Sequence, residues 1–256
     1  MNGPRTLAID IGGSGLKAIV LSAAGEMESE RTRRETPYPC TPPVLLNELT
    51  ALVATQPAHD RVSVGFPGAV RMGRVREVPA FSRRGPGEPP DPELVDQWAG
   101  FELEAALAER FGKPIRVAND ADVQGCAVIA GHGMELVITL GTGVGTAVFF
   151  DGVLLPHMEL SHGSFGGTSI EVACGDHERH KIGKDAWRKR VHEALDAFEA
   201  MVLPDHLYIG GGNAKKLDPD TLGPNRTLVP NISGLLGGIA LWERTGDPHV
   251  PTAVRS

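Results

Sequence analysis

Cysteine, long apolar runs and positive charge are all in short supply in this sequence. The three cysteines, Cys40, Cys126 and Cys174, are too few and too scattered for a disulfide framework, which fits a reducing compartment such as the cytoplasm. No apolar run approaches the roughly 20 residues that a membrane span needs. The N-terminus leads directly into a predicted strand, so no signal peptide is expected. The formal net charge of −7 argues against general nucleic-acid binding, while leaving room for a local basic groove.

What remains is the composition of an ordinary globular protein. Apolar residues make up 41% of the chain and charged residues 22%, as in typical soluble domains. The length of 256 residues allows one large domain or two smaller ones around a cleft, with ample core in either case.

A glycine-rich turn near the N-terminus joins two apolar runs, predicted as strands over 7–11 and 16–22. Glycines often serve only to join strands, and Asp10 before the turn could simply accept hydrogen bonds from it. The functional interpretation is that the glycines leave backbone N–H groups open to a phosphate chain. Ser14 and Lys17 would add donors, and Asp10 would orient a metal-bound water.

The same plan returns half a chain later, over residues 135–155. A strand, a glycine-rich turn and another strand follow one another again, with Asp10 matched by Thr139, Gly12 by Gly141 and Lys17 by Thr146. Two such hairpins predict a duplicated fold whose copies face each other. The second turn is not a dinucleotide-binding turn, because the chain continues as a strand where that motif needs a helix.

Further elements follow from apolar periodicity and from helix and turn signals. Strands are predicted at 27–35, 61–66, 74–78, 115–120 and 206–212. Helices are predicted at 44–56, 93–112, 121–131, 184–202 and 231–243.

Polar residues at two places suit hydroxyl chemistry. Asp120 follows the end of a predicted strand, where a shielded carboxylate can accept a proton from a substrate hydroxyl; the alternative is that it caps the following helix. Glu159 and His162 lie in a glycine-containing segment that suits the hydroxyls of a polyol, or that is an ordinary surface loop.

Two further patterns have both a functional and a plain interpretation. Cys174, His177 and His180 invite a zinc site, but their spacing fits no strong zinc signature and a frayed helix is the alternative. Basic residues cluster over 177–192 and over 71–84. They form either solvated faces or a track for a long phosphate chain.

Five segments in this order resemble the ROK family of sugar kinases, which has the actin-like ATPase fold. They are DIGGSGLK (10–17), VGFPG (64–68), VANDAD (117–122), LGTGVGT (140–146) and IGGG (209–212). Within that family the chain is most similar to polyphosphate glucokinases, through 65–75, 97–112, 184–191 and 203–216. The segments span nearly the whole chain, so the set is far more specific than any one of them.

The resemblance implies an α/β, duplicated actin-like (ribonuclease H-like) fold with two lobes and a cleft between them. The small lobe would comprise 1–118, with a helix at about 233–245 packing back on it, and the large lobe 119–232. The implied activity is phosphoryl transfer from polyphosphate, ATP or both to the 6-hydroxyl of glucose. Mg²⁺ would be held through donor phosphates and water rather than by a protein metal site. A cytoplasmic homodimer with no nucleic-acid or membrane partner is expected.

The resemblance also assigns roles to matching residues. Asp120 would be the general base. The sugar would be bound by Asn119, Glu159, His162, Pro67 and Gly68. The first phosphate loop would comprise Asp10, Gly12, Gly13, Ser14 and Lys17, and the second Gly141, Thr142, Gly143 and Gly145. Gly210, Gly211 and Gly212 would face a nucleotide.

The chain departs from the family pattern near the expected sugar. Ser161 stands where the family has glycine, Ser164 lies where close relatives carry a glutamate nearby, and the 82–92 loop is longer and more basic than expected. Two alternatives therefore stay open: an ATP-dependent hexose or amino-sugar kinase of the same family, and a sugar sensor without turnover. Because the first strand is predicted to begin by residue 7, the DNA-binding segment of a sensor is not expected.

Overall fold

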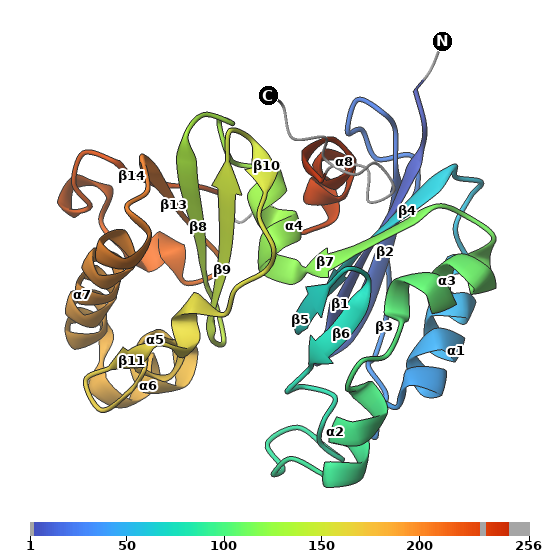
Figure 1. Cartoon of the computed structure of the whole chain (residues 1–256), viewed down its shortest axis with the longest axis horizontal. Helices are drawn as coiled ribbons and strands as arrows, with labels where there is room; N and C mark the ends of the chain where they lie inside the picture. Colours follow the sequence, from blue (N-terminus) through green and yellow to red (C-terminus); the bar gives the residue numbers. More distant parts are fainter. Residues whose placement is uncertain (1–2, 231–233, 246–256) are drawn as a thin grey trace, which may run out of the picture.

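Two five-stranded sheets, one from each half of the chain, form the centres of two lobes (Figure 1). The computed structural model describes residues 3–230 and 234–245. The first sheet has the order β3-β2-β1-β4-β7 and the second β10-β9-β8-β13-β14. The first comprises β1 (Thr6–Gly12), β2 (Gly15–Leu21), β3 (Thr32–Arg34), β4 (Arg61–Phe66) and β7 (Ile115–Asn119). The second comprises β8 (Met134–Leu140), β9 (Val144–Phe150), β10 (Val153–Leu154), β13 (His206–Gly210) and β14 (Arg226–Leu228).

The two sheets repeat one topology, which confirms the predicted duplicated fold. In each, a hairpin supplies two antiparallel strands. A later strand pairs in parallel with the first strand of the hairpin, and another pairs in parallel with that later strand. Asp10 pairs with Gly65 of β4, and Thr139 pairs with Gly210 of β13. Asp10 and Thr139 are therefore equivalent positions in the two sheets.

The match of Lys17 with Thr146 is wrong by one residue. Lys17 pairs with Asp10 across the first hairpin, whereas Thr139 pairs with Gly145 across the second. The segment between the equivalent paired residues is one residue shorter in the second hairpin, in which Leu140 pairs with Val144 and residues 141–143 form the turn. The two turns therefore present different groups at equivalent positions.

Strand β1 is buried on both faces, as its nearly continuous apolar sequence requires. Leu7 and Ile9 point into the larger core, which includes Trp98 and the helices α1 (Pro42–Val53) and α3 (Leu103–Phe111). Ala8 points to the opposite face and packs with Ile19, Leu21 and part of α8 (Gly234–Arg244). The alternation of strand side chains thus divides one strand between two cores.

The predicted helix over 93–112 is wrong as a single element. It is two helices, α2 (Pro92–Trp98) and α3, separated at Gly100, whose φ of +74° lies in the left-handed region. That conformation ends a helix and suits glycine. Trp98, at the end of α2, still reaches the core and donates its indole N–H to the Cys40 carbonyl at 2.9 Å.

The outer face of the second sheet is covered by α5 (Ile170–Cys174), α6 (Asp176–Ile182) and α7 (Lys184–Val202) (Figure 1). Trp187, Val191 and Phe198 of α7 are buried against the sheet residues, as their helical spacing predicts. Short elements complete the fold. These are the hairpins β5 (Ala69–Arg71) with β6 (Arg74–Glu77) and β11 (Ser164–Phe165) with β12 (Thr168–Ser169), and the 3-10 turns Leu160–His162, Ala214–Lys216 and Pro219–Thr221.

Some element boundaries differ from the prediction. The strand expected over 27–35 is reduced to Thr32–Arg34, with an isolated bridge between Leu21 and Met27. The helix expected over 121–131 is the shorter α4 (Asp120–Cys126). Within the described part of the chain, no helix has both the length and the apolar character required for a membrane span.

Helices α4 and α8 lie between the two sheets (Figure 1) and contact each other closely. A side chain at Gly237 would overlap the Val123 carbonyl of α4, and one at Gly238 would lie 3.0 Å from the Ala8 methyl group of β1. At the other end of α8, the Arg116 guanidinium of β7 donates to the carbonyls of Leu241 and Trp242 and stacks on the Trp242 ring. Residues 231–233 of the helix predicted over 231–243 lie outside the described residues.

Gly237→Ala should lower the free energy of unfolding by about 1–3 kcal/mol, because the new methyl group must displace the backbone of α4. The sign is informative, since alanine at an unconstrained helical position would stabilise by about 1 kcal/mol. Urea unfolding measures the difference. Gly212→Ala is the control, because a methyl group there meets nothing within 4 Å. A Gly237→Ala protein as stable as the parent would contradict the close contact.

Candidate active site

The start of α4 lies against both glycine-rich hairpins. Gly145 of the second hairpin would place a Cβ only 2.9 Å from the Ala121 methyl group, and Gly65, beside Asp10 of the first, approaches the Cα of Asp120. Asp120 is thus held between the two copies of the duplicated unit.

Asn119, and not Asp120, is the N-cap of α4. Its side-chain oxygen accepts a hydrogen bond from the Ala121 N–H at 2.8 Å, and its Nδ2 donates to the Gly68 carbonyl at 3.1 Å. One buried amide therefore starts the helix and holds the bend at Pro67 and Gly68 that follows β4. The capping role considered for Asp120 belongs to its neighbour.

Asp120 is the first residue of α4 and is partly buried. Its Oδ1 accepts from the Ala121 N–H at 2.8 Å. Burial, and then the negative charge of Asp10, raise the pKa of the Asp120 carboxyl to about 6, although the Ala121 hydrogen bond opposes the shift. A carboxyl group with such a pKa is ionised at neutral pH and is a stronger proton acceptor than an ordinary aspartate.

The first turn is fixed through its carbonyl groups. The Thr36 hydroxyl donates to Gly12 O at 2.6 Å, and the Tyr38 hydroxyl donates to Gly13 O at 2.8 Å. Ser14 is exposed at the tip. Within residues 3–230 and 234–245, the N–H groups of Gly13 and Ser14 donate no hydrogen bond, so they remain open to an anion.

Asp10 and Lys17 form an ion pair across the first hairpin, with Nζ 2.8 Å from Oδ2. Both side chains are partly exposed. In this arrangement the Lys17 ammonium fixes the Asp10 carboxylate, which in turn acts electrostatically on Asp120.

The second turn, Gly141 to Gly143, is fixed by residues that follow it in the chain. Asn213 Nδ2 donates to Gly141 O at 2.9 Å, and the Asp176 N–H donates to Thr142 O at 3.0 Å. The Asn213 amide also contacts the Asp176 carboxylate at 3.0 Å. Because Asn213 follows the segment Gly210, Gly211 and Gly212, this third glycine segment lies beside the second turn.

Glu159 and His162 lie together, and a residue that the sequence analysis missed joins them. His162 Nε2 is 3.8 Å from Glu159 Oε2 and 3.3 Å from Glu171 Oε2 at the start of α5. All three side chains are partly exposed. Two carboxylates and an imidazole at one opening form a polar surface that suits sugar hydroxyls.

Two more missed residues, Asp122 and His157, lie behind Glu159. His157 Nδ1 is 3.0 Å from Asp122 Oδ2, and its Nε2 is 3.1 Å from Glu159 Oε1. Burial alone would lower the pKa of His157, but the two carboxylates outweigh it and raise that pKa to about 10. The hydrogen bond from His157 lowers the pKa of Glu159 despite partial burial. The only signal in the sequence was the position of His157 two residues before Glu159.

Ser161, a departure from the family pattern, has its hydroxyl buried. Among the residues that the structure describes, Ser161 Oγ has no hydrogen-bond partner. An unpaired buried hydroxyl costs about 1–3 kcal/mol.

The zinc interpretation of Cys174, His177 and His180 is not supported. The Cys174 thiol is buried, which raises its pKa to about 12, and it contacts the Arg190 carbonyl. His180 is bound to Asp176. Over the described ranges, no three metal-ligating side chains of His, Cys, Asp or Glu converge.

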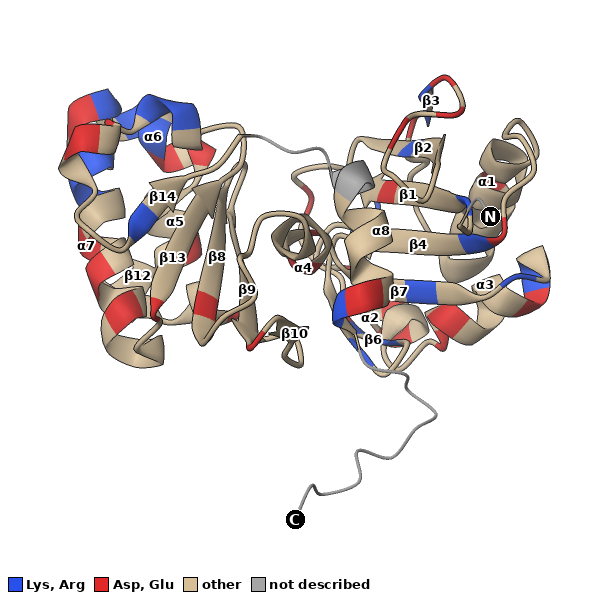
Figure 2. Ribbon diagram, turned by 90° about the horizontal axis from the view of Figure 1, so that it is seen from above, with Lys and Arg blue, Asp and Glu red and all other residues tan. Residues whose placement is uncertain are grey.

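Most of the basic side chains in the two sequence clusters pair with nearby acceptors. The cations of α6 and α7 are visible at the outer edge of the second lobe (Figure 2). Arg179 pairs with Asp176, and Arg190 pairs with Glu178. In the other cluster, Arg84 pairs with Asp91. Arg71 differs from these residues because its acceptor lies in the other half of the chain. Its guanidinium donates to the His157 carbonyl at 3.1 Å.

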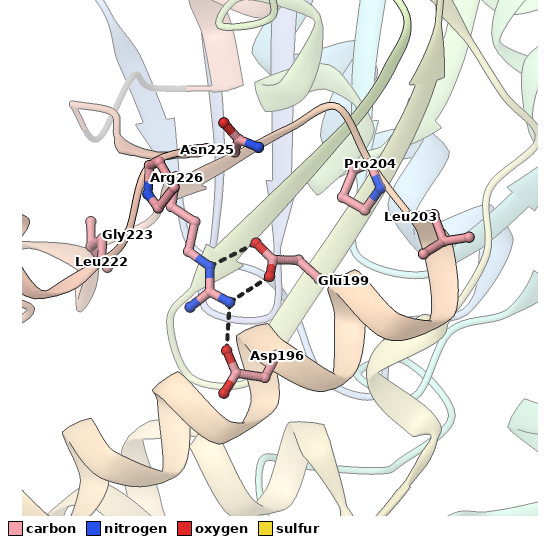
Figure 3. A pocket seen from close by; sticks show the side chains of 9 residues that line it. Asp196, Glu199, Leu203, Pro204, Leu222, Gly223, Asn225 and Arg226 are labelled. Carbon is pink, nitrogen blue, oxygen red and sulfur yellow. Dashed lines mark hydrogen bonds and ion pairs between the residues drawn. The ribbon is translucent and has the colours of Figure 1, made fainter.

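A surface hollow of about 510 Å³ lies between the end of α7 and β14, away from these groups (Figure 3). Arg226 lies in it with its guanidinium bound to Glu199 at 2.6 and 2.7 Å and to Asp196 at 2.5 Å. Its charge is already neutralised by two carboxylates, so this arrangement ties β14 to α7.

The two sheets have the duplicated topology of the actin-like ATPase fold, and similarity to sugar kinases makes the chain a phosphotransferase that acts on an alcohol acceptor. The model of the ROK family matches residues 6–180. The polyphosphate glucokinase of Mycobacterium tuberculosis (strain CDC 1551 / Oshkosh) is 31% identical over 245 residues, covering 90% of this chain and 88% of the relative. The chain therefore belongs to the ROK family.

Solved structures agree with this assignment. The inorganic polyphosphate/ATP-glucomannokinase from Arthrobacter sp. strain KM superposes with a TM-score of 0.76 at 30% identity, covering 94% of this chain and 100% of that one. A ROK family glucokinase from Streptomyces griseus, in complex with glucose and AMPPNP, has a TM-score of 0.69 at 18% identity, with 93% and 98% covered. The second likeness concerns the fold alone.

Ser161→Ala should raise the free energy of unfolding by about 1 kcal/mol, because it removes an unpaired buried hydroxyl and little volume. Ser63→Ala is the matched control. Its hydroxyl donates to Gly238 O at 2.5 Å and accepts from Trp242 Nε1 at 2.7 Å, so its loss should destabilise. Thermal and urea unfolding of both variants measure the contrast. Equal destabilisation would mean that the Ser161 hydroxyl has a partner in solution.

Proposed function

We propose that this protein transfers a phosphoryl group from polyphosphate, and less effectively from ATP, to the 6-hydroxyl of glucose. The observation that carries the proposal is the position of Asp120. Its carboxyl group lies at the start of α4, next to Asp10 of the first turn and near the second, with a pKa raised to about 6. The similarity to polyphosphate glucokinase and to the glucomannokinase supports the choice of donor and sugar.

Asp120 would act as the general base on the glucose hydroxyl. The proton of that hydroxyl must leave as the oxygen attacks phosphorus, and a carboxylate with a pKa near 6 accepts it at neutral pH. Asn119 would hold Asp120 in place through the N-cap, and would position the Pro67-Gly68 bend beside the sugar.

Glu159, His162 and Glu171 would bind the other sugar hydroxyls. The two carboxylates accept hydrogen bonds, and the imidazole between them can donate or accept. A site that bonds hydroxyls strongly rejects analogues that lack them. This is the basis for expecting a sugar and not a smaller alcohol.

The two turns would bind the donor phosphates. Phosphoryl transfer depends on positioning and on neutralising charge, with little covalent chemistry. The open N–H groups of Gly13 and Ser14 would supply donors to the phosphate oxygens. The second turn, with Gly141, Thr142, Gly143 and Gly145, would lie opposite them; its Gly141 N–H already donates to the Gly143 carbonyl at 3.0 Å. Gly210, Gly211 and Gly212 would face the base and ribose when ATP is the donor.

Mg²⁺ fits this arrangement as an ion carried by the donor phosphates. The described residues contain no cage of three carboxylates or imidazoles, whereas Asp10 offers a partly exposed carboxylate oxygen at the first turn; Mg²⁺ typically takes one or two carboxylates and keeps several waters. When bound, Mg²⁺ neutralises charge on the phosphate oxygens. Lys17 would hold the Asp10 carboxylate toward that position.

A group of cations beside the second turn favours a long anionic donor. Lys216 contacts Asn213, which holds the second turn. Burial, and then the positive charges of Arg179, Lys215 and Lys184, lower the pKa of Lys216, so these cations are close together. A polyphosphate chain that extends beyond the reacting phosphate would neutralise them.

The remaining parts of the proposal concern the whole molecule. Lobes over 1–118 and 119–232 would close on glucose and exclude water, which limits hydrolysis of the donor. The three free, buried cysteines support a cytoplasmic location. A homodimer is proposed from family membership.

Polyphosphate should support faster formation of glucose 6-phosphate than ATP, and Lys184→Ala with Lys215→Ala should lower kcat/KM for polyphosphate about tenfold. The same variant should leave ATP kinetics nearly unchanged, because ATP lacks the extended phosphate chain that the proposal places at these lysines. Lys113→Ala with Arg110→Ala, at exposed positions near the end of α3, removes the same charge and is the control. Activity with ATP alone would reject the polyphosphate donor. Sugar binding without product from either donor would favour a sensor, and product only from another hexose or an amino sugar would move the assignment within the family.

Asp120→Asn should reduce kcat by about 10²–10⁴-fold, because it keeps the shape of the side chain and removes the proton acceptor. In the parent enzyme, kcat should fall as the pH drops through about 6, where the Asp120 carboxylate becomes protonated. That acid limb should be absent from the residual activity of the variant. Steady-state rates between pH 5 and 8 measure both effects. A kcat within a few-fold of the parent would remove Asp120 from the chemical step.

A further inference from the structure

Three ionisable side chains contact one another in a row, from Asp122 on α4 through His157 to Glu159, which the proposed function places beside the sugar. Asp122 on α4 contacts His157 Nδ1, and Glu159 contacts His157 Nε2, at 3.0 and 3.1 Å. The side chains of Asp122 and His157 are 3% and 2% exposed, whereas that of Glu159 is 27% exposed. The row is therefore buried at one end and open to a ligand at the other.

The backbone on both sides of His157 is also fixed. Its carbonyl accepts from the Arg71 guanidinium of the β5–β6 hairpin, and the Met158 carbonyl accepts from the Thr146 hydroxyl of β9 at 2.9 Å. The charged groups facing the ring are Asp122 and Asp120 of α4, Glu159 of its own segment, and Arg71 behind the backbone. Three of these four are acidic.

The hydrogen-bond inventory of the ring defines its charge. An ionised carboxylate only accepts hydrogen bonds, and a neutral imidazole carries one N–H. Because His157 has a carboxyl group at each nitrogen, an imidazolium ring satisfies both contacts when the two groups are ionised, whereas a neutral ring would need one of them to be protonated. A positive charge between the two negative ones also offsets part of the penalty of burying them.

We propose that His157 is a positioning residue that, as an imidazolium anchored on Asp122, holds Glu159 by Oε1 and leaves Oε2 to receive a sugar hydroxyl. The inference rests on the proposed function, in which Glu159 binds the acceptor. It adds that the orientation and ionisation of Glu159 are set from the helix that begins with Asp120. The base and the sugar-binding carboxylate are then tied together through Asp122 and His157.

A positioning role and a merely structural role of His157 differ in their effect on the pKa of Glu159. The His157 hydrogen bond holds the pKa of Glu159 below its usual range. Loss of the imidazolium would let that pKa rise, so that glucose affinity would weaken at a higher pH than in the parent. A residue that only filled space would change stability and leave the acid limb of binding where it was.

The first test needs no ligand. In ¹⁵N-histidine-labelled protein, the ring signals of His157 are assigned by their loss in His157→Gln. Both ring nitrogens should be protonated at pH 8, with titration only near pH 10. In Asp122→Asn the same ring should titrate at a lower pH, because one of its two carboxylates is gone. A neutral His157 ring at pH 8 in the parent overturns the proposal, whatever the enzyme phosphorylates.

The second test measures glucose binding by calorimetry between pH 5 and 8. His157→Gln should weaken glucose binding about tenfold at pH 7, move the acid limb to higher pH, and change kcat at saturating glucose much less. His206→Gln is the control, since the His206 ring contacts Thr227 and Tyr208 in the second sheet.

The outcomes separate the two proposals. If the parent binds glucose and folded His157→Gln has the same glucose affinity and the same acid limb of binding, the proposed role of His157 is overturned. If His157→Gln does not fold, Asp122→Asn takes its place and should shift the limb in the same direction. A parent that binds no glucose rejects the proposed function, and with it the role of His157 toward glucose, while the ligand-free measurement still reports the charge of the ring.

Discussion

The side-chain amide of Asn119 is the contact on which the site depends. It ends β7, starts α4 and holds the Gly68 carbonyl. Without it, Asp120 would have neither a fixed helix terminus below it nor a fixed bend beside it. A single neutral, buried amide organises this region because it satisfies a donor and an acceptor at once, and it adds no charge next to a carboxyl group whose pKa depends on its surroundings.

Duplication explains why the candidate site has two glycine-rich turns, and divergence explains why they differ. The first keeps an ion pair across the hairpin, Asp10 with Lys17. The second has no such pair, because glycine lies opposite Thr139. The absence of a side chain at Gly145 lets α4 approach the second hairpin. The first hairpin thus places charged side chains near Asp120, and the second leaves room for the start of α4, which carries Asp120.

Much of the fold could be predicted from the sequence, because glycine turns and apolar periodicity are local signals. The duplicated hairpins, the strand that ends at Asn119 and helix α7 all follow from such signals. The break at Gly100 was missed, because the helical spacing of apolar residues continues across Gly100 while the helical backbone conformation does not. Asp122, His157 and Glu171 were missed for another reason: their roles arise from contacts between α4, the loop after β10 and α5, and no spacing within one segment reveals a partner in another.

The position of α8 also bears on how the chain reaches this structure. The face of the first sheet formed by Ala8, Ile19 and Leu21 is covered by a helix that begins at Gly234. During synthesis, that apolar face emerges from the ribosome early and stays uncovered until the second sheet has been made. The first half therefore lacks the helix that covers this face until residues 234–245 have been made. A nascent chain of this protein presents an unprotected sheet face for most of its translation, which is the kind of surface that chaperones bind.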